Sequence, residues 1–189
     1  MLNNPGTFFY FLITPMTNTQ KNRVGILMGS DSDWPKIKAV AAALDEFEVG
    51  YEVNVMSAHR TPDLVFNYAQ SAKERGLQVL IAAAGGAAHL AGVCAAHTIL
   101  PVIGIPVPTE LAGGLDSLLS TVQMPGDIPV ATVGAGMGGP RNAGLLAVQI
   151  LALSDPSLSD RLIQFKRGLV SKVKQRNESL QKALIEPLT

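Results

Sequence analysis

Apolar residues recur along this chain at two spacings, and the alternation between them predicts strands separated by helices. Short continuous or alternating apolar runs are typical of strands, and uninterrupted runs indicate strands buried on both faces of a sheet. The predicted strands cover residues 24–28, 51–56, 79–84, 101–107 and 128–133. Apolar residues at helical spacing predict helices over residues 37–44, 61–75, 91–98, 111–123, 142–153 and 155–181.

This regular alternation predicts an α/β fold, with a parallel sheet of about five strands and helices on both faces. The sequence contains no internal repeat and no linker that would divide the fold. We expect a single α/β domain over residues 23–182, preceded by a disordered or loosely docked extension at residues 1–22 and followed by a tail at residues 183–189. The apolar run at residues 8–13 is too short for a membrane span, which needs about 20 residues.

The last predicted helix is long for a chain of 189 residues. At ~1.5 Å per residue, residues 155–181 would extend for about 40 Å. The composition is also apolar for a monomer of this size, with 47% hydrophobic and 16% charged residues. We therefore expect a homo-oligomer in which this helix extends along a neighbouring subunit.

Charge and cysteine content narrow the possible partners and the compartment. The formal net charge is zero, so the sequence carries no basic footprint for nucleic acid or for an anionic membrane. Cys94 is the one cysteine, which excludes an intrachain disulfide and a cysteine metal cluster. We interpret it as a core residue and expect a cytoplasmic protein without nucleic-acid or membrane partners.

The loop after the first predicted strand is rich in glycine and serine. Ligands in open α/β sheets bind at the carboxyl ends of the strands. Backbone N–H groups there, with the hydroxyls of Ser30 and Ser32, could hold a phosphate, and Asp33 could accept hydrogen bonds from a ribose. The alternative is that Ser32 or Asp33 only caps the following helix.

The loop at residues 57–62 follows the second predicted strand. It places His59, which titrates near neutrality, beside the permanent cation Arg60. Thr61 and Pro62 have the residue types of a helix N-cap and first helical position. By itself, the loop is more typical of an ordinary connection that carries a surface histidine.

The loop at residues 85–90 follows the third predicted strand. Its two glycines and two alanines leave room for a flat ligand to lie against the backbone. His89 could face a ligand, cap the next helix or be buried and bonded to the backbone, and we favour a structural role. His97 is expected inside that helix in a structural role.

Residues 134–139 form a literal G-x-G-x-x-G motif. A dinucleotide fingerprint occupies the first strand-to-helix turn and is followed by another strand. Here the motif follows the last predicted strand, and Pro140 is expected to interrupt the start of the next helix. We therefore predict a flexible loop over the rim of a site.

The three strand-end loops, in this combination and order, and the sequence at residues 116–125 resemble the 5-(carboxyamino)imidazole ribonucleotide mutase family. That family is the catalytic subunit of bacterial phosphoribosylaminoimidazole carboxylase, in de novo purine (IMP) biosynthesis. The resemblance covers roughly residues 23–170. It implies a flavodoxin-like three-layer αβα sandwich, usually an octamer, with a small ribonucleotide substrate and neither a metal nor an organic cofactor.

The resemblance also implies roles for individual residues. His59 is similar to the family's catalytic histidine, and Arg60 to its phosphate contact. The implied substrate-binding residues are Ser30, Ser32, Asp33, Ser57, Ala58, Arg60, Gly85, Gly86, Ala87, His89 and Leu90. The chain departs from the family pattern at Ala91, where many relatives have proline, and in the glycine-rich stretch before Arg141.

The implied reaction moves a carboxyl group from the exocyclic nitrogen to carbon 4 of the imidazole, with one histidine as acid and then base. Three alternatives remain open. One is a direct carboxylase that takes carbon dioxide, although the sequence of residues 85–89 is more similar to the mutase class. The others are a noncatalytic nucleotide-phosphate binding protein and a flavodoxin-like redox protein, the latter weakened by the scarcity of aromatic residues near the loops.

Overall fold

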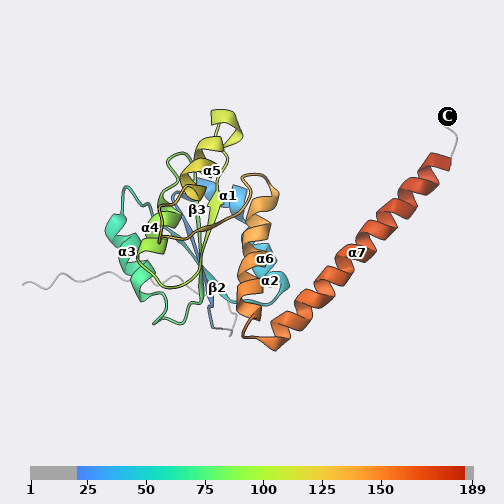
Figure 1. Ribbon diagram of the computed structural model, residues 1–189, viewed down its shortest axis with the longest axis horizontal. Helices are drawn as coiled ribbons and strands as arrows, with labels where there is room; N and C mark the ends of the chain where they lie inside the picture. Colours follow the sequence, from blue (N-terminus) through green and yellow to red (C-terminus); the bar gives the residue numbers. More distant parts are fainter. Residues whose placement is uncertain (1–20, 186–189) are drawn as a thin grey trace, which may run out of the picture.

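The computed structural model describes residues 21–185, and its centre is a five-stranded parallel sheet with the strand order β2-β1-β3-β4-β5 (Figure 1). The strands are β1 (Val24–Met28), β2 (Tyr51–Val55), β3 (Val79–Ala84), β4 (Val102–Pro106) and β5 (Ala131–Thr132). The order reverses direction at β1. The carboxyl ends of β2, β1 and β3 are therefore neighbours at one edge of the sheet.

Helices cover both faces of the sheet, which confirms the predicted three-layer α/β fold. One face carries α1 (Trp34–Ile37), α2 (Ala39–Glu46) and α6 (Gly138–Ala152). The other face carries α3 (Pro62–Ser71), α4 (Leu90–Ala96) and α5 (Leu115–Val122). Two short 3₁₀ helices, η1 (Asp31–Asp33) and η2 (Leu111–Gly113), lie in the connections.

Each central strand contributes side chains to two separate hydrophobic clusters. Successive residues of a strand point to opposite faces. Ile26 accordingly packs in the cluster beneath α2 and α6, and Leu27 in the cluster beneath α3 and α4. The α2–α6 contact is close at Gly144, where a Cβ atom would lie 2.7 Å from the carbonyl oxygen of Val40. Glycine is therefore required there by packing.

Cys94 of α4 lies in the second cluster, which confirms the prediction of a core residue. Its side chain is fully buried and forms no disulfide. Burial raises the pKa of its thiol to about 12, because an apolar environment disfavours the thiolate. Cys94 is therefore unreactive in the folded protein.

Several element boundaries differ from the predicted ones. Strand β5 has two residues instead of six. It follows Pro129, which has no N–H to donate to a neighbouring strand. Helix α3 ends at Ser71, and residues 72–75 form turns up to Gly76, whose φ is +92°. Helix α4 ends at Ala96, so His97 lies at its C-cap instead of inside the helix.

The prediction that Pro140 interrupts the start of α6 was wrong. The helix begins at Gly138, so Pro140 lies in its first turn. The first four N–H groups of a helix have no partner within the helix, and proline at that place therefore sacrifices no hydrogen bond.

Helix α7 (Pro156–Ile185) extends from the body of the molecule (Figure 1). Its 30 residues correspond to about 45 Å at 1.5 Å per residue. Leu158 is buried, and Leu162 and Phe165 pack against the first cluster. Beyond Gly168 every described residue is exposed, including the apolar side chains of Val170 and Val173.

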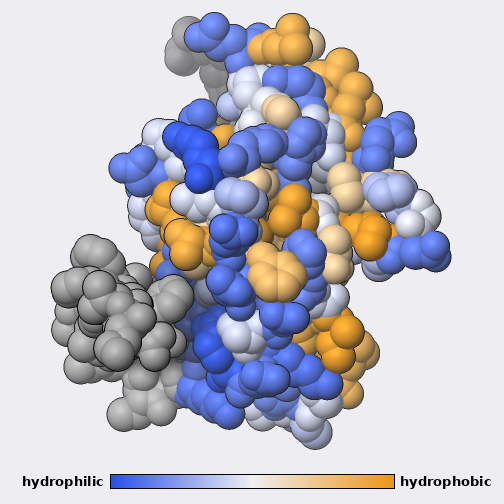
Figure 2. Space-filling model, turned by 90° about the vertical axis from the view of Figure 1, so that its left-hand side faces the viewer, coloured by the Kyte–Doolittle hydropathy of each residue, from blue (hydrophilic) through white to orange (hydrophobic). Residues whose placement is uncertain are grey.

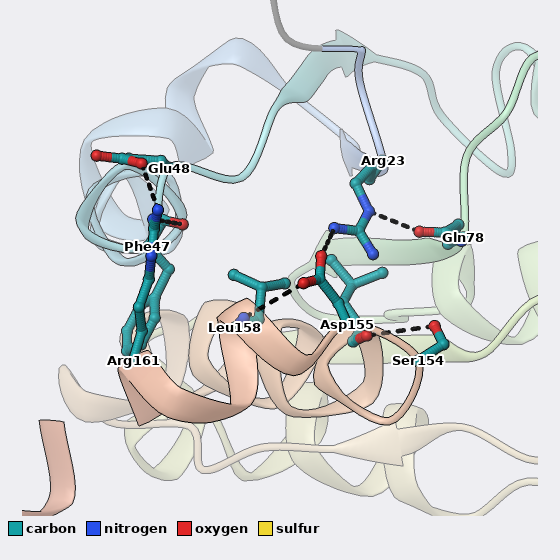
Figure 3. A network of polar contacts seen from close by, with 9 residues as sticks. Arg23, Phe47, Glu48, Gln78, Ser154, Asp155, Leu158 and Arg161 are labelled. Atoms are coloured by element: carbon teal, nitrogen blue, oxygen red, sulfur yellow. Dashed lines mark hydrogen bonds and ion pairs between the residues drawn. The ribbon is translucent and has the colours of Figure 1, made fainter. Parts of the chain in front are cut away.

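Polar contacts fix the start of α7 to the body of the protein (Figure 3). Arg23 at the entrance to β1 forms an ion pair with Asp155, with 2.7 Å between Nη1 and Oδ2. Arg161 donates to the carbonyl oxygen of Phe47 at 3.0 Å and pairs with Glu48 at 2.7 Å. The hydrogen bond from Arg23 is the main reason that the pKa of Asp155 lies below its usual range.

The predicted extension and tail lie largely outside the described part of the chain, which excludes residues 1–20 and 186–189. These two domain boundaries therefore stay predictions. Among the helices of residues 21–185, none combines the length and the apolar character needed to cross a membrane.

Candidate active site

A cleft of about 450 Å³ opens where the loops after β1, β2 and β3 meet. The pairing of β1 with both β2 and β3 brings these loops together from positions far apart in the sequence. Its lining residues are Gly29, Ser30, Asp33, Ser57, Ala58, His59, Arg60, Ala84, Gly85, Ala87, His89 and Leu90. Of the predicted catalytic and substrate-binding residues, all but Ser32 and Gly86 belong to this lining.

The first loop is held by Ser30, which caps η1. The hydroxyl of Ser30 accepts a hydrogen bond from the N–H of Ser32 at 3.3 Å and lies 2.8 Å from the Ser32 hydroxyl. Asp33 lies at the N-cap of α1 but makes no side-chain cap to it, so the structure does not bear out the alternative in which Ser32 or Asp33 only caps the helix. The Asp33 carboxylate is left to face the cleft, and partial burial raises its pKa above the ordinary value.

The second loop closes on itself through Ser57 and Thr61. Thr61 accepts a hydrogen bond from the N–H of Ser57 at 2.9 Å and donates to the Ser57 carbonyl at 3.2 Å. Helix α3 begins at Pro62 as predicted, but Thr61 provides no side-chain cap because its hydroxyl is used within the loop. The hydroxyl of Ser57 in turn accepts from the N–H groups of His59 and Arg60. These bonds fix the backbone that carries the two side chains.

Arg60 joins the first and second loops. Its Nη2 donates to the carbonyl oxygen of Gly29 at 2.9 Å, and its Nε lies 3.4 Å from the hydroxyl of Ser57. Within residues 21–185, no carboxylate forms an ion pair with Arg60. The guanidinium therefore brings a positive charge to the cleft that a bound anion could neutralise.

His59 and His89 form a hydrogen bond with each other across the cleft. The Nε2 atom of His59 lies 2.8 Å from Nδ1 of His89, and the rings meet edge to face, with their centroids 4.9 Å apart. Both side chains are exposed. The sequence-based preference for a structural His89 was wrong, since the side chain neither caps α4 nor bonds to the backbone. One nitrogen of the contact must donate and the other accept, so the two rings share a single proton along this line.

The third loop is supported from behind by α5. Gly86 has a φ of +69°, its N–H donates to the hydroxyl of Ser117 at 2.9 Å, and its carbonyl accepts from Ser120 at 3.1 Å. Asp116 accepts from Thr109 at 2.6 Å and from the N–H of Ser117 at 2.8 Å. These bonds, with Thr109 first, hold the pKa of the Asp116 carboxyl below its usual range.

Sequence reasoning missed the supporting serines as well as Gly29 and Ala84. The signal for Ser117 and Ser120 was present, since hydroxyls three residues apart lie on one face of a helix. Their partner Gly86 lies 31 and 34 residues earlier in the chain, and helical spacing cannot identify so distant a contact.

Comparison with known proteins places the chain. The model of AIR carboxylase matches residues 23–172. The chain belongs to the AIR carboxylase family. Two relatives named N5-carboxyaminoimidazole ribonucleotide mutase show how similar it is. The one from Mycobacterium tuberculosis H37Rv is 55% identical over 163 residues, covering 86% of this chain and 92% of the relative. The one from Bacillus subtilis 168 is 53% identical over 157 residues, covering 83% and 97%.

A crystal structure of Treponema denticola PurE has the same architecture as this AIR carboxylase family chain. It matches with a TM-score of 0.74 at 29% identity, over 83% of this chain and 97% of that one. The agreement supports the α/β fold with a parallel sheet and helices on both faces.

The G-x-G-x-x-G motif of this AIR carboxylase family chain does not line the cleft. It follows the two-residue edge strand β5 and leads into α6. A Cβ atom at Gly139 would collide with the carbonyl oxygen of Gly134. Close backbone packing at the start of α6 therefore explains at least this glycine.

Within residues 21–185, no three His, Cys, Asp or Glu side chains come close enough to hold a metal ion together. The lining of the described cleft offers two histidines, one arginine, one carboxylate, serine hydroxyls and backbone amides.

Proposed function

We propose that this protein is an isomerase that converts 5-(carboxyamino)imidazole ribonucleotide to 5-amino-4-imidazolecarboxylate ribonucleotide in de novo purine biosynthesis. The observation that carries the proposal is the 53–55% identity, over nearly the whole domain, to proteins named as this mutase. The cleft supports it, because an acid–base residue, a cation and a glycine-lined wall occur together.

The proposed substrate is held through its phosphate, ribose and ring. Arg60 neutralises the phosphate, with the hydroxyls of Ser30 and Ser57 as further donors. Asp33 accepts hydrogen bonds from the ribose hydroxyls, since a carboxylate would repel the phosphate. Gly85 and Ala87 line the wall against which the flat imidazole lies. These contacts would fix the ring relative to His59, which lowers the entropic part of the barrier.

In the proposed first step, His59 acts as an acid. The bond between the exocyclic nitrogen and the carboxyl carbon breaks, its electron pair stays on nitrogen, and the nitrogen takes the proton of the His59 imidazolium. The products are carbon dioxide and aminoimidazole ribonucleotide, both still in the cleft.

In the second step, carbon 4 of the electron-rich ring attacks the trapped carbon dioxide and forms the new carbon–carbon bond. The proton on carbon 4 then returns to His59, which restores the imidazolium. One group acts as acid and then base, and the sum of the steps is an isomerisation that needs neither a metal nor an organic cofactor. His89, bonded to His59 at 2.8 Å, would orient the ring of His59 for both transfers.

The test is to mix the purified protein with freshly made 5-(carboxyamino)imidazole ribonucleotide without ATP, metal or added bicarbonate, and to follow the ring-carboxylated product. Rapid product formation supports the mutase. Product only from aminoimidazole ribonucleotide with high bicarbonate would assign the protein to the direct carboxylases. Binding without turnover in both mixtures would leave a nucleotide-phosphate binding protein.

The proposal includes a homo-oligomer, with eight subunits as the expected number, and a cytoplasmic location. The oligomer is supported by α7, whose exposed apolar residues have no cover within residues 21–185. Further exposed apolar residues occur on the face that Figure 2 shows, where orange patches lie among polar residues. The cytoplasmic location is supported by the reduced, buried Cys94 and by a substrate of central metabolism.

A further inference from the structure

We propose that Ser117 and Ser120 of α5 are positioning residues that hold the loop of residues 85–89 closed around the reacting carbon dioxide. The proposal rests on the function proposed above. It assigns a task to a part of the chain that does not itself line the cleft.

Ser117 is fully buried, and the surrounding bonds fix the direction of its hydroxyl. The N–H of Gly86 donates to its oxygen at 2.9 Å. The hydroxyl proton is directed to Oδ1 of Asp116, at 3.4 Å, and Thr109 donates to the same oxygen. Asp116 therefore orients the Ser117 lone pairs toward Gly86.

Ser120 holds the other side of the same residue. Its hydroxyl lies 3.1 Å from the carbonyl oxygen of Gly86 and 2.7 Å from the carbonyl oxygen of Asp116, one helical turn earlier. The single proton of the Ser120 hydroxyl is shared between these two carbonyl oxygens, and the Asp116 carbonyl is the nearer. Helix α5 therefore holds the Gly86 N–H through Ser117 and its carbonyl, more weakly, through Ser120. Glycine can adopt many backbone conformations. The bonds to α5 favour the one seen here, in which the φ of Gly86 is +69°.

Further hydrogen bonds connect Gly86 along the loop to His89, and through His89 to His59. The carbonyl of Gly86 also accepts from the N–H of Ala88 at 2.8 Å, and the carbonyl of Ala87 accepts from the N–H of His89 at 2.8 Å. The ring of His89 then bonds to His59. Movement of Gly86 would therefore displace both the wall of the cleft and the partner of His59.

The consequence is specific to a reaction with a small neutral intermediate. Carbon dioxide offers few groups for binding, so a closed wall is what retains it near carbon 4. A displaced loop would release carbon dioxide and aminoimidazole ribonucleotide in place of product. This ratio of released to converted substrate is a quantity that a general loss of stability does not change.

The test compares Ser117→Ala and Ser120→Ala with two matched variants. Ser120→Thr keeps the hydroxyl. Thr121→Val removes another buried hydroxyl of α5, whose one hydrogen bond within residues 21–185 is to the Ser117 carbonyl. Each protein is given 5-(carboxyamino)imidazole ribonucleotide, and product and aminoimidazole ribonucleotide are both measured after subtracting spontaneous decarboxylation. Hydrogen–deuterium exchange of residues 85–90 is followed on the same proteins.

We expect the two alanine variants to form product about 10- to 100-fold more slowly, to release a larger share of aminoimidazole ribonucleotide and to exchange faster at residues 85–90. Ser120→Thr keeps the hydroxyl and should therefore give values close to those of the unaltered protein. Thr121→Val should also behave as the unaltered protein. Ser120 is only half-buried, so its variants decide the matter if Ser117→Ala does not fold.

An unchanged ratio of released to converted substrate, or exchange no faster than in Thr121→Val, would overturn the inference. Failure of the proposed function is distinguishable from this result. In that case the unaltered protein forms no product, while exchange at residues 85–90 still reports whether the serines hold the loop.

Discussion

The two histidines of the cleft act as a pair because their nitrogens lie on one hydrogen-bond line, 2.8 Å apart. Two N–H groups cannot face each other at that distance, so one of these two nitrogens donates and the other accepts. In the proposed mechanism His59 would exchange its proton with the substrate through its other ring nitrogen, Nδ1, while the bond between Nε2 and His89 keeps the ring in place.

At this scale we predict that His59→Asn abolishes turnover but not binding. Asparagine can still bond to His89 but has no proton to exchange near neutrality, and general acid–base catalysis typically contributes about 10²–10⁴-fold. We expect kcat to fall by at least about 100-fold, with nucleotide affinity, measured by calorimetry, within a few-fold. His97→Asn, outside the cleft, is the matched control. A His59→Asn protein that turned over near the original rate would contradict the proposed mechanism.

The sequence predicted the residues of the cleft far better than their contacts. His59, Arg60 and Asp33 could be found because they follow strands, and strand ends converge at one edge of a parallel sheet. The bond from His59 to His89 joins residues 30 positions apart. This bond depends on how the loops after β2 and β3 are placed relative to each other, and the spacing of residues in the sequence does not specify that placement. For the same reason Thr61 resembled a helix cap although its hydroxyl is bonded to Ser57.

At the scale of the elements, the α2–α6 contact depends on one missing side chain. We predict that Gly144→Ala destabilises the protein by about 1–3 kcal/mol, because the new Cβ overpacks the interface with Val40 and Ala43. Alanine is otherwise the better helix former, by about 1 kcal/mol. Gly168→Ala in α7, where an added Cβ would meet no atom of another element within residues 21–185, should be neutral or stabilising.

Denaturant unfolding of both glycine variants measures the difference. Equal effects of the two substitutions would show that helix propensity, and not packing between α2 and α6, decides the outcome.

The ion pair at the start of α7 should make that attachment sensitive to acid. The pKa of Asp155 is lower in the folded protein than in the unfolded chain. Its contribution to stability is therefore present above the ordinary aspartate pKa and is lost as the pH falls through the lower, folded value.

We predict that Asp155→Asn lowers the Tm at pH 7 and flattens the decline of the Tm between about pH 5 and pH 3. Part of the decline should remain in the Asp155→Asn protein, because the pKa of Asp116 is also lowered in the folded state. Asp160→Asn, one turn into α7, provides the control, since among residues 21–185 its carboxylate forms no ion pair. An Asp155→Asn protein with an unaltered acid profile would show that Arg23 does not stabilise the charged carboxylate.

The sequence predicts the helices and strands well where buried apolar residues recur regularly, but it does not predict where these elements end. Strands β1, β3 and β4 are almost wholly buried, so their apolar runs are unambiguous. The apolar pattern predicts six residues for β5, but only two of them pair with β4, and the pattern does not show where pairing stops. Helix ends are decided by local hydrogen bonds, and these depend on side chains whose positions the sequence does not give.

At the scale of the whole molecule, the exposed apolar side chains of α7 lie mainly on one side of the helix. They include Ile163, Val170, Val173, Leu180 and Leu184. A stripe at this spacing is costly to leave in water and is typical of helices that pack against a partner.

We predict that Val173→Glu disrupts the proposed oligomer. A charge placed in a packed apolar interface would be desolvated without a partner. Sedimentation should give a multiple of 19.9 kDa for the original chain and a smaller multiple for the variant. Ser179→Glu places the same charge on the opposite side of α7 and should leave the mass unchanged. An original chain that sediments as a monomer, or loss of assembly in both variants, would contradict an interface on this stripe.

The isolation of Cys94 has a practical consequence. Because the chain has a single thiol and that thiol is inaccessible, alkylating reagents find no target until α4 separates from the sheet. The rate of alkylation then measures how often this layer opens, without any added label. Alkylation of Cys94 can therefore report the opening of the α4 layer in the same solution in which the activity is assayed.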